Sequence, residues 1–175
     1  MNRFFLWGIT AVNLSVISFV LYLYFTKEKI AYVNLNKVYK EFEMKKELEN
    51  KLISIQQNRK TIIDSLEIQL RAFSRHFEKA VKIDEKEQLM FDQKKEEYRS
   101  KKKNFTEDNQ ALTQQYTDQI MKQLNEYVRN YGKDHNYDFL LGADNNGSIM
   151  HAKEQFDVSD DVIKYINKAY KGVIK

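Results

Sequence analysis

The side chains with the most reactive chemistry are three histidines and one pair of adjacent carboxylates. His76, His135 and His151 are far apart and lack the short spacings of metal ligands. Asp160 and Asp161 begin a predicted helix, where the helix dipole favours acidic residues without any catalytic role. The chain has no cysteine, and its five glycines form no phosphate-binding loop. The sequence therefore predicts a protein that is not an enzyme and uses no metal or cofactor.

A second set of residues is suited to weak binding of another chain. The ten residues from Lys94 to Lys103 carry six cations and two acids. A solvated helix face is the first interpretation, and contact with an acidic client or a lipid is the alternative. Aromatic residues nearby should mostly join two helices, and any surplus would be free to touch an unfolded chain. The candidate client-binding residues are Phe73, Phe77, Phe91, Lys94, Lys95, Tyr98, Arg99, Lys101, Lys102, Lys103 and Phe105.

Long helices must position these residues. No glycine lies between Gly8 and Gly132, and the chain has no proline, so helix breakers are absent from this region. Apolar residues at three- and four-residue spacing, interrupted at Arg59, predict a coiled-coil-like first arm over residues 36–82. The residues of this stripe are Leu48, Leu52, Ile55, Ile62, Leu66, Leu70, Phe73, Phe77 and Ala80.

A second arm is expected to return after a tip at residues 82–86. Phe91, Tyr98, Phe105 and Leu112 recur every seven residues, and polar Lys102 and Asn109 lie where the stripe should be completed. The arms should therefore pack less tightly there. Gly132 is the predicted C-cap glycine, so the helical hairpin occupies residues 36–131.

Short segments at both ends of the hairpin predict a small β-body, made of residues 30–35 and 137–175. Residues 30–35 and 137–141 have the composition of strands, and residues 144–147 form a turn to a return strand at 148–151. A final amphipathic helix follows, with Ser159 as its N-cap. The fold class is thus α+β, mostly α, with a long antiparallel helical hairpin inserted into a small β-body. Three short strands leave open edges, so association of bodies is expected through Val33, Leu35, Phe139 and Leu141.

The first 26 residues predict export. Phe4 to Phe25 is an uncharged apolar segment that would span about 33 Å as a helix, enough to cross a bilayer. A cleaved signal peptide needs small residues before its cleavage site, whereas this segment ends in LYLYFT. An uncleaved signal anchor is therefore favoured, with a cleaved signal as the alternative. Both interpretations export residues 27–175 as the second domain.

The charge of the chain is mildly basic. Lys and Arg total 29 and Asp and Glu 25, for a net charge of +4. This is far from the dense basic face of a nucleic-acid-binding protein, so no nucleic-acid partner is expected. Anionic lipid, lipopolysaccharide and acidic protein clients remain compatible with the charge.

The order of these segments resembles one protein family. The stretch IAYVNLNKVYKEFEMKKELENKL, the helical hairpin, YGKDHNYDFLL and the closing DVSDDVIKYIN are similar to the OmpH-like periplasmic chaperones, the Skp family. The resemblance covers about residues 30–175. It implies a homotrimer whose arms surround a cavity for unfolded outer-membrane proteins, without ATP or metal. Two departures are the apolar N-terminal segment, which would tether the chain to the inner membrane, and a weaker basic charge.

The sequence is therefore compatible with two functions. The first is an ATP-independent holdase that binds unfolded outer-membrane proteins in the periplasm and prevents their aggregation. The second is a membrane-anchored coiled-coil structural or adaptor protein of an envelope complex. A simple spacer would not need the predicted strands, which favours the holdase.

Overall fold

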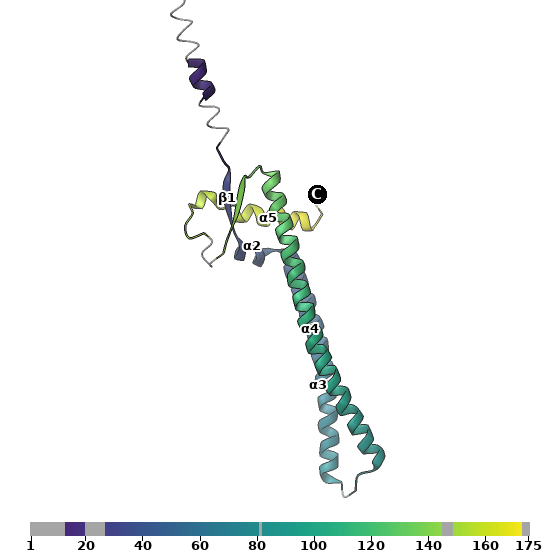
Figure 1. Cartoon of the computed structure of the whole chain (residues 1–175). Coiled ribbons are helices and arrows are strands. Elements are labelled where there is room, and N and C mark those ends of the chain that lie inside the picture. Colours follow the sequence, from purple (N-terminus) through teal and green to yellow (C-terminus); the bar gives the residue numbers. More distant parts are fainter. Residues whose placement is uncertain (1–12, 20–26, 81, 145–148, 173–175) are drawn as a thin grey trace, which may run out of the picture.

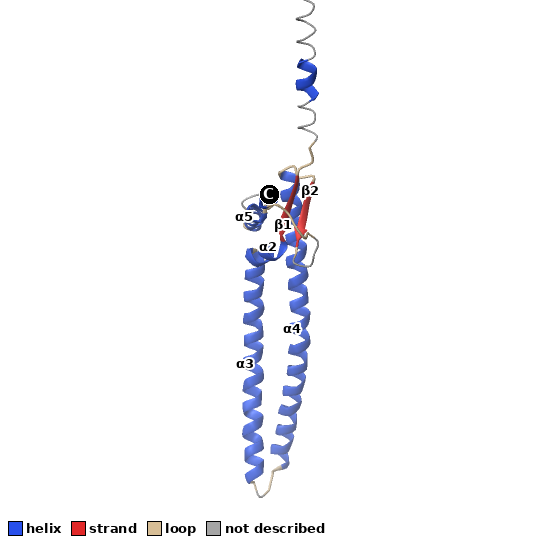
Figure 2. Cartoon of the chain, turned by 90° about the vertical axis from the view of Figure 1, so that its left-hand side faces the viewer, coloured by secondary structure: helices blue, strands red, loops and turns tan. Residues whose placement is uncertain are grey.

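The computed structural model of the chain describes residues 13–19, 27–80, 82–144 and 149–172. A small body carries one long arm, which is a hairpin of two helices, α3 (Glu43–Lys79) and α4 (Glu85–Asp134) (Figures 1 and 2). With 37 and 50 residues, these helices are about 55 and 75 Å long. The other elements are β1 (Ile30–Asn34), α2 (Leu35–Glu41), β2 (Phe139–Ala143), the 3-10 helix η1 (Glu154–Phe156) and α5 (Ser159–Tyr170). The predicted helical hairpin, inserted between strands from the two ends of the chain, is confirmed.

The first arm is interrupted near its start, where a continuous helix was expected. Phe42 has extended backbone angles, φ −71° and ψ 120°, and separates α2 from α3. Its side chain is fully buried, so the chain bends to place the ring in the core. Asn167 of α5 satisfies the backbone at this break: its oxygen accepts from the Glu43 N–H at 2.9 Å, and its amide donates to the Glu41 carbonyl at 3.1 Å. The prediction missed the break because it depends on a residue far away in the sequence.

The two ends of the second arm also differ from expectation. Helix α3 ends at Lys79 and α4 begins at Glu85, so the turn between the arms comes slightly before the predicted 82–86. The prediction that Gly132 caps α4 is wrong, because Gly132 is buried inside the helix. Asn136 takes the left-handed conformation instead, with φ 53°. The Tyr137 N–H bonds the Gly132 carbonyl at 2.9 Å and the Asn136 N–H bonds the Lys133 carbonyl at 3.1 Å, which is the Schellman pattern.

The sheet joins the two ends of the sequence. Strands β1 and β2 are parallel, with Ile30 opposite Phe139 and Asn34 opposite Ala143. Residue 35 begins α2 rather than ending the strand. The predicted return strand is wrong over residues 149–151, which form no strand; residue 148 and most of the predicted turn lie outside the described residues. The outer side of β1 forms a single bridge instead, in which the Val158 N–H donates to the Tyr32 carbonyl at 3.0 Å.

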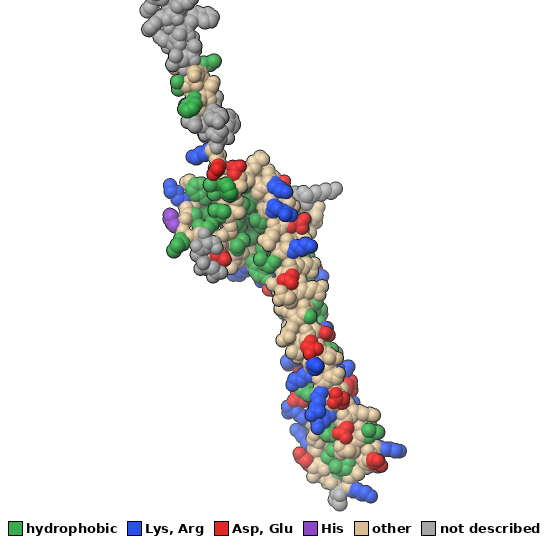
Figure 3. Space-filling model, viewed as in Figure 1, with side chains coloured by type: hydrophobic (Ala, Val, Ile, Leu, Met, Phe, Trp, Pro, Cys, Tyr) green, Lys and Arg blue, Asp and Glu red, His purple; other side chains and the backbone are tan. Residues whose placement is uncertain are grey.

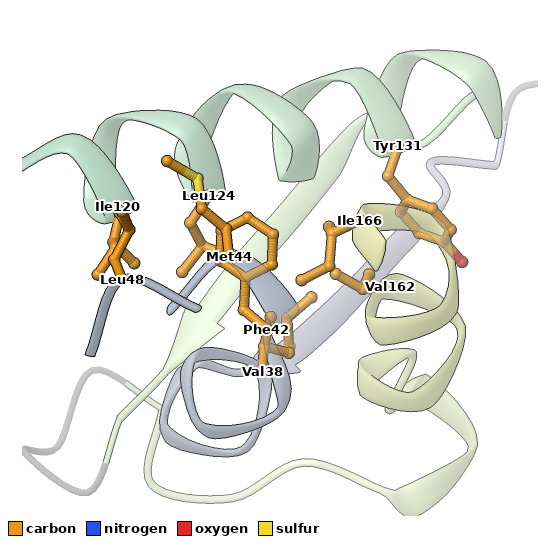
Figure 4. Close-up of a cluster of buried hydrophobic side chains, with 10 residues drawn as sticks. Val38, Phe42, Met44, Leu48, Ile120, Leu124, Tyr131, Val162 and Ile166 are labelled. Atoms are coloured by element: carbon orange, nitrogen blue, oxygen red, sulfur yellow. The ribbon is translucent and has the colours of Figure 1, made fainter. Parts of the chain in front are cut away.

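The core lies where the arm enters the body (Figure 4). Phe42 meets the rings of Tyr127 and Tyr170 edge-on, at centroid distances of 6.1 and 5.9 Å. Burial raises the pKa of Tyr131 to about 12. The core draws buried residues from strand β1, from helices α2, α3, α4 and α5 of the arm and body, and from the break between α2 and α3. They are Val33, Val38, Phe42, Met44, Leu48, Ile120, Leu124, Tyr131, Val162 and Ile166.

Helix α5 is tied to the rest of the body by polar contacts at its first turn. Ser159 is the first helical residue, not the predicted N-cap, and its buried Oγ accepts from the Asn34 N–H at 2.8 Å. Its hydroxyl donates to Asp157. The acidic first turn is as predicted, and Asp160 pairs with Lys37 of α2 at 2.6 Å. The hydrogen bond from Lys37 lowers the pKa of Asp160.

Two glycines offer a matched test of this packing. A Cβ on Gly142 of β2 would lie 2.7 Å from Leu35 Cδ1, closer than carbon atoms approach, whereas a Cβ on Gly132 would meet Leu140 at 3.8 Å. We expect Gly142→Ala to lower the free energy of unfolding by about 1–3 kcal/mol through overpacking. Gly132→Ala should raise it by about 0.5–1 kcal/mol, because alanine favours the helix. Urea unfolding followed by circular dichroism compares them, and equal effects of the same sign would contradict this account.

The N-terminal segment is only partly described. Residues 13–19 are helical and exposed. Among the described residues, no helix has the length and apolar character needed to cross a membrane. Most of the segment from Phe4 to Phe25 lies outside these residues, so the membrane anchor and the division at residue 26 stay predictions.

Candidate interaction surfaces of the arm and the body

The candidate aromatic residues lie between the two arm helices. Phe73 and Phe77 of α3 and Phe91 of α4 form one cluster, with centroid distances of 6.2, 6.3 and 5.3 Å. All three are half-buried. They therefore join the hairpin near its tip, as most of the aromatic residues were expected to do, and only their outer edges remain open to another chain.

The cations of residues 94–103 differ in how they are held. Lys94 Nζ donates to Gln69 Oε1 across the arm at 2.8 Å, and Lys102 donates to the Tyr98 hydroxyl at 3.2 Å, which raises the pKa of Lys102. Lys101 and Lys103 pair along their own helix with Glu97 and Glu107, at 3.6 and 3.9 Å. The exposed side chains of Lys95 and Arg99 have no such contact within the described part of the chain. Basic side chains gather on the distal half of the arm (Figure 3).

The polar interruptions of the two arms meet one another. Arg59 Nη1 donates to Asn109 Oδ1, and Nη2 lies 3.4 Å from Asp108 Oδ2. The guanidinium carbon is also 5.4 Å from the centre of the Phe105 ring. We call these four residues the Arg59 layer. The sequence showed the interruptions at Arg59 and Asn109 separately, and did not show that they are partners.

The arm also carries exposed aliphatic side chains that the sequence pattern did not predict. Ile62 was assigned to the apolar stripe, but it is 43% exposed and Ile63 is half-buried in its place. Apolar residues off the three- and four-residue spacing would have been the signal. Those exposed along the arm and its tip are Ile53, Ile62, Ile68, Ile83, Leu89, Met90 and Met121.

The body also presents an apolar surface. Phe139 and Leu141 are 51% and 45% exposed, whereas Val33 lies in the core and Leu35 packs towards Gly142. A hollow of about 430 Å³ lies beside Leu141, and apolar side chains are visible over this face in Figure 3. Its apolar lining is Ile30, Ala31, Leu141, Ile149, Ala152 and Phe156. Two of the four predicted association residues are thus available on the surface.

The three histidines lie in three different environments. His76 Nε2 is 3.5 Å from Glu87 Oε2 across the arm, and His135 stacks on Tyr131 with 4.1 Å between ring centres. His151 lines the hollow of the body. The described residues contain no cluster of histidine, cysteine and acidic side chains fit to hold a metal ion. The exposed apolar and basic side chains of the arm and the body are the candidate binding surfaces.

The sequence of the chain matches that of a known protein family. Residues 29–166 match the sequence model of a family described as outer membrane protein (OmpH-like). The chain belongs to the OmpH-like family. The OmpH-like match begins at the residue before β1 and includes the whole hairpin and most of α5, and the first 28 residues lie outside it.

A curated relative agrees with the OmpH-like assignment. The chain is 23% identical over 146 residues to the chaperone protein Skp of Blochmanniella pennsylvanica (strain BPEN). The alignment covers 80% of this chain and 86% of that protein. At the level of the family, the likeness supports a chaperone rather than an enzyme.

Proposed function

We propose that this OmpH-like protein is an ATP-independent holdase that binds unfolded outer-membrane proteins in the periplasm and prevents their aggregation. The observation that carries the proposal is the distal arm, where exposed aliphatic residues such as Ile68 and Leu89 occur together with the cations Lys95 and Arg99. An unfolded chain offers apolar side chains and acidic stretches in no fixed order. A surface with both kinds of contact binds such a chain without a sequence requirement.

Each contact in this mechanism is weak. An exposed charge pair contributes roughly 0.2–1 kcal/mol, and an aliphatic side chain that is only partly covered contributes about as little. Affinity must therefore come from many contacts acting together, which also lets the client leave without an energy source. The anionic groups of lipid or lipopolysaccharide are further candidate partners of the same cations.

The proposal is tested by diluting an unfolded β-barrel protein from urea with or without the purified chain and following light scattering. We expect the chain to suppress scattering without ATP. A structural or adaptor protein of the envelope would leave the scattering unchanged, and that result would favour the alternative function.

The body is proposed to assemble the chain into a homotrimer. The exposed Phe139 and Leu141 and the adjoining hollow supply the apolar area that association would cover. We expect Phe139→Asp with Leu141→Asp to sediment as a monomer with unchanged helix content, because charge at a buried interface is costly. Ile53→Asp, at a similarly exposed position of the arm, is the control and should keep the trimer. A parent chain that is a folded monomer at micromolar concentration would contradict the proposal.

Residues 4–25 are proposed to hold the chain in the inner membrane, with residues 27–175 in the periplasm. The support is the uncharged sequence of this segment and the bulky residues at its end. Mass spectrometry of the membrane fraction should find peptides of residues 1–26 joined to the rest of the chain. Mature protein that begins near Lys27 in the soluble fraction would show a cleaved signal instead.

A further inference from the structure

The Arg59 layer is a polar layer inside an otherwise apolar contact between helices. The Arg59 side chain is only 23% exposed, and its guanidinium is held by three residues of one face of α4. Towards the body the stripe continues with Ile55 and Leu112, and towards the tip with Ile63 and the buried Leu66. A charged group thus takes a place where aliphatic side chains would pack.

The stability of the hairpin does not explain why a charged residue occupies position 59 of the apolar stripe. Replacing a partly buried ion pair and its hydrogen bonds with well-packed apolar residues is often neutral or stabilising, because the charged groups lose hydration when they pair. The best-attested role of a polar residue in a coiled-coil stripe is to specify which helix pairs with which, at a cost in stability. A polar layer at Arg59 would therefore oppose pairing of α3 with some helix other than α4.

The competing partner is the arm of a second copy. The stripe of α3 is apolar at Leu48, Leu52, Ile55, Leu66 and Leu70, and any helix with a similar stripe satisfies these residues. When two identical helices pack in parallel, each residue lies opposite its own copy. Arg59 would then meet Arg59, with no acceptor for either guanidinium. Helix α4 alone brings Phe105, Asp108 and Asn109 together at this level of the arm.

We propose that the Arg59 layer selects the partner of α3, so that each arm closes on its own return helix and does not pair with the arm of a second copy. This selection of a helix partner is a property beyond holdase activity. It rests on the proposed homotrimer, because assembly is what brings the arms of different copies close together. Pairing of α3 helices from two copies would bury the stripe residues between the copies instead of against α4. It would also cover the binding surface that each arm otherwise exposes. Like-charge contact supplies the repulsive element that such selectivity needs.

The absence of cysteine from the chain allows a direct test. Ile55→Cys places one thiol in the stripe of α3, one turn from Arg59. In the correct hairpin this thiol faces α4 and has no partner, whereas parallel pairing of two α3 helices brings two such thiols together. The full chain in mild detergent is oxidised, and covalent dimers are quantified on denaturing gels.

Ile55→Cys alone should give few dimers. Adding Arg59→Leu and Asn109→Leu should raise the dimer yield about tenfold or more, because the altered stripe no longer discriminates between partners. Lys60→Leu, an exposed position next in sequence, controls for added apolar surface and should leave the yield unchanged. Exchanging the charges, with Arg59→Asp and Asp108→Arg, should also keep the yield low, because like charges would still meet between copies.

Helix content by circular dichroism shows whether each variant folds. Arg59→Met with Asn109 unchanged is the milder test and should give an intermediate yield. Parent-level dimer yields in both the leucine and the methionine variants would overturn the proposal. Failure of the trimer itself would appear separately, as a monomer in sedimentation of the unaltered chain.

Discussion

Replacing the six cations of residues 94–103 with glutamine is expected to weaken capture of an unfolded outer-membrane protein about tenfold and to remove most of its salt dependence, since exposed charge contacts are individually weak but add up. The cations lie on the distal half of α4, and glutamine keeps both length and helix propensity. Assembly should be unchanged, because the body is far from this stretch. Binding is measured by fluorescence anisotropy of a labelled client at low and high salt.

A control variant with six substitutions elsewhere tests whether the location of the charge matters, and not only its amount. Lys40, Lys46, Lys51, Lys60, Lys164 and Lys168 are exposed and lie in the body and the proximal arm, so changing them to glutamine gives the same net charge. We expect this control to bind clients nearly as well as the parent. Equal binding by the parent and the distal variant at low salt would mean that the basic stretch is only a solvated face.

Within the distal stretch, the structure predicts unequal contributions. Lys101 and Lys103 already pair with acids of their own helix, and Lys94 bonds across the arm. Lys95 and Arg99 are free of such contacts in the described chain, so the pair Lys95→Gln and Arg99→Gln should account for more than its share of the loss. Lys101→Gln with Lys103→Gln is the matched comparison.

Phe42→Ala is expected to lower the free energy of unfolding of the body by about 3–5 kcal/mol, a large part of the stability of a domain of this size. Phe42 is fully buried and supports the rings of Tyr127 and Tyr170. It also occupies the break between α2 and α3, so its loss removes the contact that orients the arm on the body. Near-ultraviolet circular dichroism in urea reports the packed tyrosines.

Met150→Ala also truncates a large apolar side chain, at a position of the body that is 94% exposed. It should cost well under 1 kcal/mol, as surface substitutions do. Similar losses from the two substitutions would show that Phe42 is not part of a close-packed core.

Features that depend on neighbouring residues were predictable, and those that depend on contacts between distant residues were not. The hairpin was predictable because helix propensity and apolar spacing act over a few residues, and no glycine or proline occurs between Gly8 and Gly132. The stripe was assigned correctly at Leu48 and Leu66, both buried, and wrongly at Ile62. The spacing allows either of two adjacent isoleucines, and only packing against α4 selects Ile63.

The body was less predictable because its contacts join residues more than 100 positions apart. Composition showed that residues near 30–35 and 137–141 form strands, but it carries no information on parallel pairing or on a bridge to Asp157 in place of a third strand. The cap of α4 was placed at Gly132 because glycine tolerates positive φ at least cost. Asn136 tolerates it too, and α4 continues through Gly132 to Asp134.

Local propensity and periodicity are enough to predict a long helical hairpin closed by strands from both ends of the chain. Which side chains are available for binding depends on how the distant segments pack against one another. This packing placed Phe73, Phe77 and Phe91 against one another and left aliphatic residues and Lys95 and Arg99 exposed. It also paired Arg59 with Asn109, because two interruptions become one polar layer only when the return helix brings them to the same level.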